Sequence, residues 1–385
     1  NAADHLTHFY AFFMPDFARP VYAGRPWHAE AVRRHAAEQG EQTRRAIAAR
    51  ARWFELVGVL GGRWPHTHSL QPGGSSRAID AAERLRLLVR VREFRAWLEQ
   101  QLVGAPLEQL TALPDEAALQ AWADGGTGGD LRLFLAIAAD TGLASLGRGP
   151  GRALSVGAFP DAEGRPALAA GWWCEGQPLQ PLSLDRLTED ATHAWLADAG
   201  GPRHPAQGLT QPLADKPEAY TWNKAPRLAG QTAETGAVAR QLADGQPLVV
   251  DLARRHGITV LVRVVARLVE LARLVPLMEA WLQALAPREP FAVPLVLPAE
   301  GAAVGLNEAA RGSLGHWLRV EGGRLAHYQI VAPTSWNFSP RDGRGQPGPL
   351  EQALVGTPVQ SGEATPVAVQ HVVRSFDPCM VCTVH

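Results

Sequence analysis

Two of the chain's three cysteines, Cys379 and Cys382, lie close to the last residue of the sequence. Two residues separate them, Asp377 and Pro378 precede them, and His385 ends the sequence. A Cys-x-x-Cys pair can present two thiolates to one metal centre, and soft sulfur ligands suit nickel, zinc and iron. Spacing alone favours other interpretations: a redox dithiol, half of a zinc site or an incidental pair. The terminal position favours a metal, because a chain end normally frays unless something holds it.

Size and composition limit the class of protein. The chain has 385 residues, 46% of them hydrophobic and 19% charged, which is typical of one large or two ordinary globular domains. A net charge of −1 gives no global attraction to nucleic acid or anionic lipid. Three cysteines do not make a disulfide framework, and no run of about 18 uncharged apolar residues predicts a membrane span.

The apolar pattern predicts a mostly α (α+β) fold, with a core of long helices and a small β region near the C-terminus. We expect residues 1–385 to form a single domain. Long helices are predicted at 28–60, at about 75–103 with Ser75 and Ser76 as the cap, and at 258–285 with a kink at Pro276. Further helices are predicted at 116–124, 130–143, 189–198, 348–355 and 366–374, and a β-hairpin at 316–332.

Several segments, in order along the chain, carry a resemblance to a known family. They are Asp4-His-Leu-Thr-His-Phe-Tyr10, Gly61-Gly-Arg-Trp-Pro-His66, Pro72-Gly-Gly74, Tyr220-Thr-Trp-Asn-Lys-Ala-Pro-Arg227, Glu308-Ala-Ala-Arg-Gly-Ser-Leu-Gly-His-Trp317, Ala332-Pro-Thr-Ser-Trp-Asn337 and the terminal Asp377-Pro-Cys-x-x-Cys-x-x-His385. Together they resemble the large subunit of nickel–iron hydrogenases over the whole length of the chain.

The resemblance implies a nickel–iron centre whose iron carries cyanide and carbon monoxide. By position, Cys379 matches a ligand of nickel alone, and Cys382 matches a thiolate that bridges nickel and iron. His385, together with the main-chain carbonyl of Ile330, matches a magnesium site near the C-terminus. Without the resemblance, a histidine at a chain end is an ordinary disordered residue.

The resemblance also implies residues that surround the metals. Arg311 matches an arginine over their open side, and Asp4 and Asp377 match the carboxylates that orient it. Pro333 and Thr334 match a pair that packs around the diatomic ligands of iron. Each residue type has a plain alternative: a surface ion pair for an arginine, a turn for an aspartate before proline, and a strand end for Pro333.

The sequence departs from the family in one respect. The other two metal-binding cysteines belong to an Arg-x-Cys-Gly-x-Cys motif that precedes the Asp-His segment in the family, and the sequence contains no such motif. A glutamate thought to relay protons belongs to the same region. We therefore expect either that an N-terminal segment is missing from the sequence or that the protein lacks it, which would favour a maturation scaffold; as written, the chain offers half of a nickel site.

Three functions fit these observations. Phe12, where respiratory relatives usually carry leucine, resembles the H2-sensing branch, which would be cytoplasmic and would signal to a histidine kinase. An uptake hydrogenase and a maturation scaffold holding the Fe(CN)2CO group are the alternatives, and plain core packing is the alternative for Phe12. In both hydrogenase interpretations H2 is the substrate. An iron–sulfur small subunit is the expected partner, because the chain has no cysteines to spare for a cluster. His66 matches a histidine near the point where electrons pass to that subunit.

Overall fold

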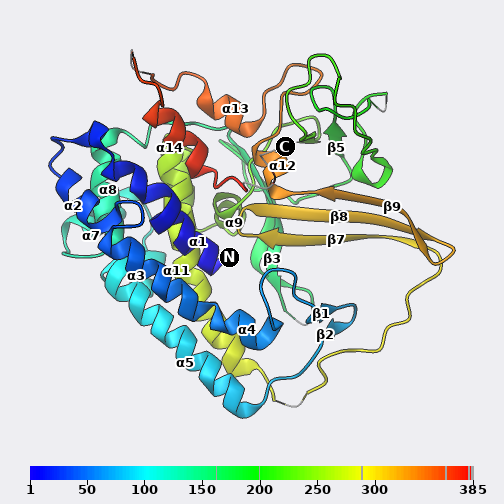
Figure 1. Cartoon of the computed structure of the whole chain (residues 1–385), viewed down its shortest axis with the longest axis horizontal. Coiled ribbons are helices and arrows are strands. Elements are labelled where there is room, and N and C mark those ends of the chain that lie inside the picture. The colour runs from blue at the N-terminus through cyan, green and yellow to red at the C-terminus, as the bar shows by residue number, and fades with distance from the viewer. Residues whose placement is uncertain (162, 199, 288, 360–361, 380–381, 383–385) are drawn as a thin grey trace. The chain divides into compact units, whose positions relative to one another are not determined.

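The chain forms two compact units. The structure, a computed structural model, describes residues 1–385 except 162, 199, 288, 360–361, 380–381 and 383–385 (Figure 1). The first unit comprises 1–113, 117–140 and 268–297, and the second comprises 114–116, 141–267 and 298–385. The long helix α11 (Val260–Ala284) contributes to both units and continues through Pro276. That residues 1–385 form a single domain stays a prediction.

Over its described residues, the first unit is helical apart from one small hairpin. Its elements are α1 (Ala2–Thr7), η1 (His8–Phe13), η2 (Met14–Ala18), η3 (Pro20–Tyr22), α2 (His28–His35), α3 (Glu41–Trp53), α4 (Glu55–Gly61), β1 (Leu70–Gln71), β2 (Gly74–Ser75), α5 (Ala81–Trp97), η4 (Leu98–Val103), α6 (Leu107–Thr111), most of α7 (Glu116–Asp124) and α8 (Asp130–Thr141), and the later part of α11. Helices α3 and α5 lie side by side (Figure 1).

The prediction of one helix over 28–60 is wrong, because the chain turns twice within it. Helix α2 ends at His35, and the backbone stays extended at Ala36 and again at Gly40, which precedes α3. A Cβ atom at Gly40 would lie 2.4 Å from the carbonyl oxygen of Arg34, so this close approach needs glycine. The single helical pattern is therefore divided into α2, α3 and α4.

The predicted cap of the second long helix is also wrong. Asp80 caps α5: its carboxylate accepts from the backbone N–H of Glu83, and the Glu83 carboxylate accepts from the backbone N–H of Asp80. Ser75 lies in β2, ahead of the helix. The buried residues of α5 follow the predicted helical spacing; they are Leu87, Leu88, Val91 and Phe94.

Buried polar pairs fix the N-terminal helices of the first unit. His5 Nε2 lies 2.8 Å from Glu270 Oε1 on α11, and both side chains are fully buried. The Tyr10 hydroxyl donates to Asp130 Oδ2 at 2.6 Å, and Arg34 Nε donates to Asp130 Oδ1 at 2.6 Å. Burial raises the pKa of Asp130, but hydrogen bonds from His35 and Arg34 outweigh it, so that the pKa lies below its usual range. These pairs hold the segment that carries Asp4 and Phe12.

The second unit combines three small antiparallel sheets with short helices. Its strands are β3 (Arg152–Pro160), β4 (Pro166–Cys174), β5 (Leu187–Asp190), β6 (Ala225–Leu228), β7 (Gly301–Ala309), β8 (Gly312–Glu321) and β9 (Arg324–Val331). Its other elements are η5 (Pro205–Gln207), α9 (Ala237–Ala243), α10 (Pro247–His256), the start of α11, α12 (Pro333–Asn337), α13 (Pro349–Leu354) and α14 (Val367–Ser375). The strands pair as β3–β4, β5–β6 and β7–β8–β9.

The predicted helix over 189–198 is wrong. Residues Leu187–Asp190 form β5, which pairs with β6, a strand distant in sequence. Asp190 then accepts a hydrogen bond from the backbone N–H of Thr192, which is a turn that competes with a helix. Long-range pairing outweighs the local helical pattern here.

The predicted hairpin over 316–332 is confirmed as β8 and β9, with a third strand, β7, that the pattern did not indicate. Strand β7 is rich in alanine and glycine, and most of its side chains are exposed, which removes the alternation that indicates a strand. Ala310 and Arg311 form the turn from β7 to β8.

The other predicted helix ranges hold closely, and the kink at Pro276 stays a prediction. Helices α7, α8, α13 and α14 match the four ranges predicted for them within a few residues. The fold class, mostly helical with a small β region toward the C-terminus, is confirmed. Among the described residues, no helix is long and apolar enough to cross a bilayer.

Candidate metal centre

The two terminal cysteines come together in a turn after α14. The Cys382 backbone N–H donates to the carbonyl of Cys379 at 2.9 Å, and both side chains are half-buried. Burial and the neighbouring Cys379 thiol raise the pKa of Cys382 to about 11, while the Thr334 hydroxyl and the charge of Arg311 act in the opposite direction. The Cys382 thiol is therefore within interaction range of Cys379, Thr334 and Arg311.

Arg311 lies directly against Asp377. Its Nε donates to the main-chain carbonyl of Asp377 at 3.1 Å, and its Nη2 lies 3.3 Å from Asp377 Oδ1. Asp377 is buried, whereas the Arg311 side chain keeps 34% of its surface exposed. The guanidinium thus binds both the side chain and the main chain of the residue that precedes Pro378 and Cys379, and it is oriented as a result.

A buried ion pair holds the turn that carries Arg311. Arg240 donates from Nη1 to Glu308 Oε2 and to the carbonyl of Ala309, both at 2.8 Å, and from Nη2 to the carbonyl of Ala310 at 3.1 Å. Gly312 completes the turn with φ +134°, and a Cβ atom there would lie 2.1 Å from Thr235 Oγ1. The sequence motif 308–317 is therefore a structural frame for Arg311.

Asp377 itself occupies an unusual conformation. Its φ of +55° lies in the left-handed region, which non-glycine residues rarely adopt. Its Oδ2 atom is buried and has no hydrogen-bond partner among the described residues. A buried, unpartnered carboxylate oxygen is costly unless a further group serves it, and such features cluster at functional sites.

Pro333 and Thr334 begin helix α12, and both are buried. Proline suits this first-turn position, because it has no N–H group to satisfy. The Thr334 carbonyl accepts from the backbone N–H of Phe338, and its hydroxyl acts to lower the pKa of Cys382. The structure therefore brings together Thr334, Cys379, Cys382, Arg311 and Asp377, which were predicted from separate parts of the sequence.

The roles of the other predicted residues stay predictions. Asp4, in α1, and Phe12, in η1, belong to the first unit. The Ile330 side chain on β9 is exposed. His385 lies outside the described residues. His66 is exposed on the loop after α4, where Arg63 donates to its main-chain carbonyl.

The ligands fit a nickel–iron centre in part. Two thiols supply soft sulfur of the kind that suits nickel and iron. Among the described residues, no group of three or more histidine, cysteine, aspartate or glutamate side chains could hold a metal ion. Cys379 and Cys382 therefore offer two thiolates, which is half of the ligand set that the resemblance implies.

Two arginines of α11 near this cluster were not assigned a role from the sequence. Arg263 and Arg267 contact Ser375, two residues before Asp377. In the sequence, both arginines stand out as charged residues within the most apolar helical stretch. They are four residues apart, which places both on one face of the helix.

Comparisons with known proteins agree with the site. A family described as nickel-dependent hydrogenase matches residues 44–385. The large subunit of the periplasmic NiFeSe hydrogenase of Desulfomicrobium baculatum is 27% identical, over 99% of this chain and 75% of its own length. The hydrogenase-2 large chain of Escherichia coli is 28% identical, over 86% of this chain and 62% of its own.

Solved structures extend the likeness to the fold. The chain is 26% identical to a variant of the NiFeSe hydrogenase of Desulfovibrio vulgaris Hildenborough, with a TM-score of 0.84 over 100% of this chain and 79% of that one. The Desulfomicrobium baculatum enzyme gives a TM-score of 0.83 at 26% identity, over 100% of this chain and 80% of that one.

The chain belongs to the nickel-dependent hydrogenase family. Its named relatives are large subunits of such enzymes, so the predicted enzyme class, a hydrogenase large subunit, is confirmed at this level. This chain spans between 62% and 75% of the two curated relatives described above.

If Cys382 is a ligand, Cys382→Ser should abolish nickel and iron incorporation, because a hydroxyl is a poor substitute for a bridging thiolate. Elemental analysis of the purified protein measures this directly. Cys174→Ser is the matched control, since Cys174 is a half-buried thiol of β4, and it should keep its metals. Full metal content in Cys382→Ser would contradict the assignment.

Proposed function

We propose that the chain is the H2-cleaving subunit of a hydrogenase, with Cys379 and Cys382 as two of its metal ligands. The observation that carries the proposal is the contact of Arg311 with Asp377, beside both cysteines and Thr334. A bound nickel–iron centre with cyanide and carbon monoxide on iron would supply the Lewis acid and the redox chemistry for heterolytic cleavage of H2. The overall reaction releases two protons and two electrons from each H2.

The residues of this chain would prepare the site and handle protons. Arg311 presents a fixed positive charge, and electrostatic groups that are oriented in advance stabilise developing charge without reorganisation. Asp377 Oδ1 lies against the guanidinium, and its Oδ2, which lacks a hydrogen-bond partner among the described residues, is available as a proton acceptor. The Thr334 hydroxyl can donate to an anionic ligand such as cyanide. Asp4 is proposed as the second carboxylate that orients Arg311.

A maturation scaffold fits these observations less well. Such a protein needs to hold an iron group and release it, and it does not need an arginine oriented by a buried aspartate. The Arg311–Asp377 contact and the buried Arg240–Glu308 frame behind it therefore support an enzyme. We retain the magnesium site at His385 and the Ile330 carbonyl as part of the proposal.

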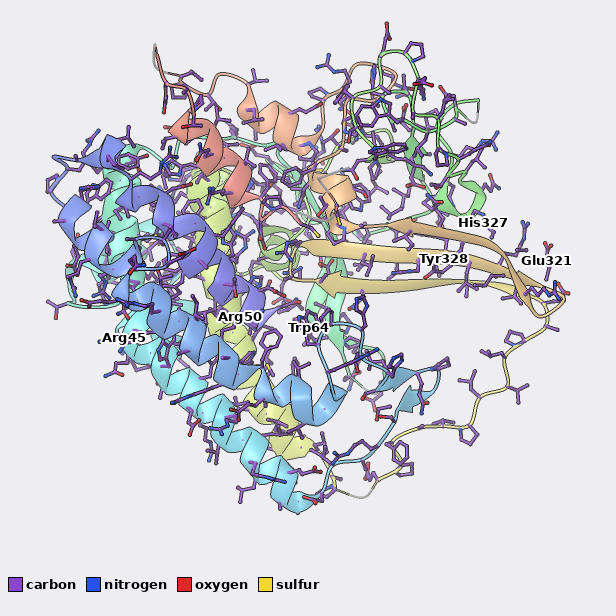
Figure 2. All side chains as sticks on the ribbon, in the orientation of Figure 1. Arg45, Arg50, Trp64, Glu321, His327 and Tyr328 are labelled. Atoms are coloured by element: carbon purple, nitrogen blue, oxygen red, sulfur yellow. The ribbon has the colours of Figure 1, made fainter. Side chains whose placement is uncertain are left out.

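An iron–sulfur small subunit is the proposed partner, because electrons from H2 must leave the site. In the first unit, the β1–β2 hairpin pairs with residues 291–293, so these two segments are adjacent. Both segments, and the residues that follow the second, carry exposed apolar side chains. Leu70 and Val296 are 78% and 93% exposed, and Figure 2 marks Trp64 on the neighbouring loop after α4. Exposed apolar patches mark protein interfaces, and His66 lies on the same loop.

The physiological role has two candidates. Uptake and periplasmic enzymes are the named relatives, which supports an uptake role. Phe12 supports the second candidate, a cytoplasmic H2 sensor that signals to a histidine kinase. Its side chain is half-buried, with its ring 6.0 Å from that of His8, so a residue of this size narrows the space around it.

Arg311→Lys should lower H2 oxidation by about a hundredfold or more while metals are retained, because lysine keeps the charge but loses the planar fork that binds Asp377. The measurement is H2 oxidation with an artificial acceptor at known nickel content. Arg319→Lys, which alters an exposed ion pair on β8, is the control and should be close to wild type. Normal turnover by Arg311→Lys would refute the role of Arg311.

The chain purified without a small subunit should reduce an artificial acceptor far more slowly than the two-subunit complex. The reason is that the chain has no cysteines to spare for an iron–sulfur cluster. Rates are compared at equal nickel content. Equal H2-dependent rates for the single chain and the complex would overturn the need for this partner.

If Phe12 narrows the path of gas, Phe12→Leu should speed inactivation by O2 and leave the nickel and iron content unchanged. Leucine is smaller than phenylalanine, and O2 is larger than H2, so a wider path favours O2. The measurement is the decay of activity under air. Phe54→Leu, at another half-buried ring of the first unit, is the control. An unchanged decay in Phe12→Leu would remove the support for a sensor.

A further inference from the structure

The segment that carries Asp377 and the cysteines begins at the end of α14, and two arginines of α11 bind this end. Both belong to the second unit, as do all of the groups they bind here. Arg263 and Arg267 are 2% and 5% exposed, so each guanidinium is held away from water. Buried arginines are costly unless their donors are satisfied, which makes their partners informative.

Arg263 uses all five of its N–H donors. Its Nε and Nη2 bind the two carboxylate oxygens of Glu234, at 2.7 and 2.9 Å. Its remaining donors reach the carbonyls of Gly147 and Ile258, at 2.8 and 3.0 Å, and the Ser375 hydroxyl, at 3.3 Å. One side chain therefore joins Glu234, Gly147 and Ile258 to the last residue of α14.

Arg267, one turn further along α11, binds the same residue from the main-chain side. Its Nη1 and Nη2 both donate to the carbonyl of Ser375, at 3.2 Å each. Carbonyls in the last turn of a helix have no partner within that helix, and a cation there also complements the helix dipole. Arg267 thus caps α14 from a different helix.

The next residue extends this arrangement toward Thr334. The Arg263 guanidinium lies over the ring of Phe376, with Cζ 3.8 Å from the ring centroid. Phe376 in turn packs edge-on against Phe338, the residue that ends α12, at 6.2 Å between ring centroids. Helix α12 begins with Pro333 and Thr334, so the same contacts connect both elements that meet at the cysteines.

We propose that Arg263 and Arg267 are positioning residues that hold residues 375–379 so that Asp377 meets Arg311 and the two cysteines face one metal centre. The assignment to a metal centre rests on the proposed function. The position of Asp377 requires a left-handed backbone, which persists only where surrounding contacts enforce it. The two arginines supply such contacts immediately before it, and Arg311 supplies them at Asp377 itself.

Thiol labelling of the full-length, metal-free chain tests the proposal without relying on activity. Arg267→Met should raise the maleimide labelling rate of Cys379 and Cys382, relative to Cys174, by about tenfold or more, the scale of losing hydrogen bonds to a charged group. Arg267→Lys should recover part of the protection, because lysine can still donate to the Ser375 carbonyl. Ser375→Ala, a milder change, should give a smaller increase.

Arg227→Met is the matched control. Arg227 is also buried in the second unit, pairs with an acid, Asp342, and uses its five donors, but it binds the loop at 339–346 and not residues 375–379. It should leave the labelling ratio unchanged. An unchanged ratio in Arg267→Met, or an equal rise in Arg227→Met, would overturn the proposal.

Metal content separates this inference from the function on which it rests. In the two-subunit complex, Arg267→Met should hold less nickel than wild type, and Arg267→Lys should restore part of it. Wild-type complex without nickel or iron would refute the proposed function, and the labelling ratio would then still decide whether the arginines hold the cysteine segment.

Discussion

The contact between Arg311 and Asp377 joins two parts of the second unit that have no local reason to meet. Arg311 lies in the turn from β7 to β8, and Asp377 lies after α14, 66 residues later. Each partner is fixed from behind: the turn by the buried Arg240–Glu308 pair, and Asp377 by α14, whose end is bound by α11. Removing one member of the buried Arg240–Glu308 pair would cost about 3–5 kcal/mol. The turn that carries Arg311 therefore tolerates substitutions of this pair poorly, but it keeps one geometry.

That single geometry is what the proposed metal site needs. A guanidinium used for proton transfer or charge stabilisation must be held within a fraction of an ångström of its working position. Here its orientation comes from two contacts with one residue, the side chain and the main chain of Asp377. The same residue precedes Pro378 and Cys379, so the position of the arginine and the position of Cys379, a proposed metal ligand, are set together.

The cluster around Cys379 and Cys382 was predicted from sequence motifs, and the periodicity of apolar residues did not indicate it. Cys379, Cys382, Asp377, Arg311 and Thr334 were identified because each stands in a segment that resembles the hydrogenase large subunit, and the structure brings these five together. Arg263 and Arg267 were missed because a periodic pattern shows only that a charge interrupts an apolar helix. The pattern does not show which carbonyl or carboxylate such an arginine binds. For both arginines one partner is Ser375, which is more than 100 residues away in the sequence.

The fold was predictable where local signals agree with packing, and not where they conflict. Helix α14 and the β8–β9 hairpin have clear periodicity and matched their predicted ranges. The helix expected over 28–60 failed at Gly40, where a close approach of backbone decides the conformation, and the helix expected over 189–198 failed because β5 pairs with a strand distant in sequence. For β5 the deciding contact is with a strand distant in sequence, and at Gly40 it is a close backbone approach to Arg34; an apolar pattern records neither of them.

The central claim is that this chain, in its complex, cleaves H2 heterolytically at the Cys379–Cys382 site beside Arg311. Isotope exchange tests it most directly, because it needs no electron acceptor: protein with a known nickel and iron content is kept under D2 in ordinary water, and the gas phase is followed by mass spectrometry. The account predicts HD and H2 in the gas, formed much more slowly by Arg311→Lys at equal metal content. Failure of metal-loaded wild-type protein to form any HD would contradict it.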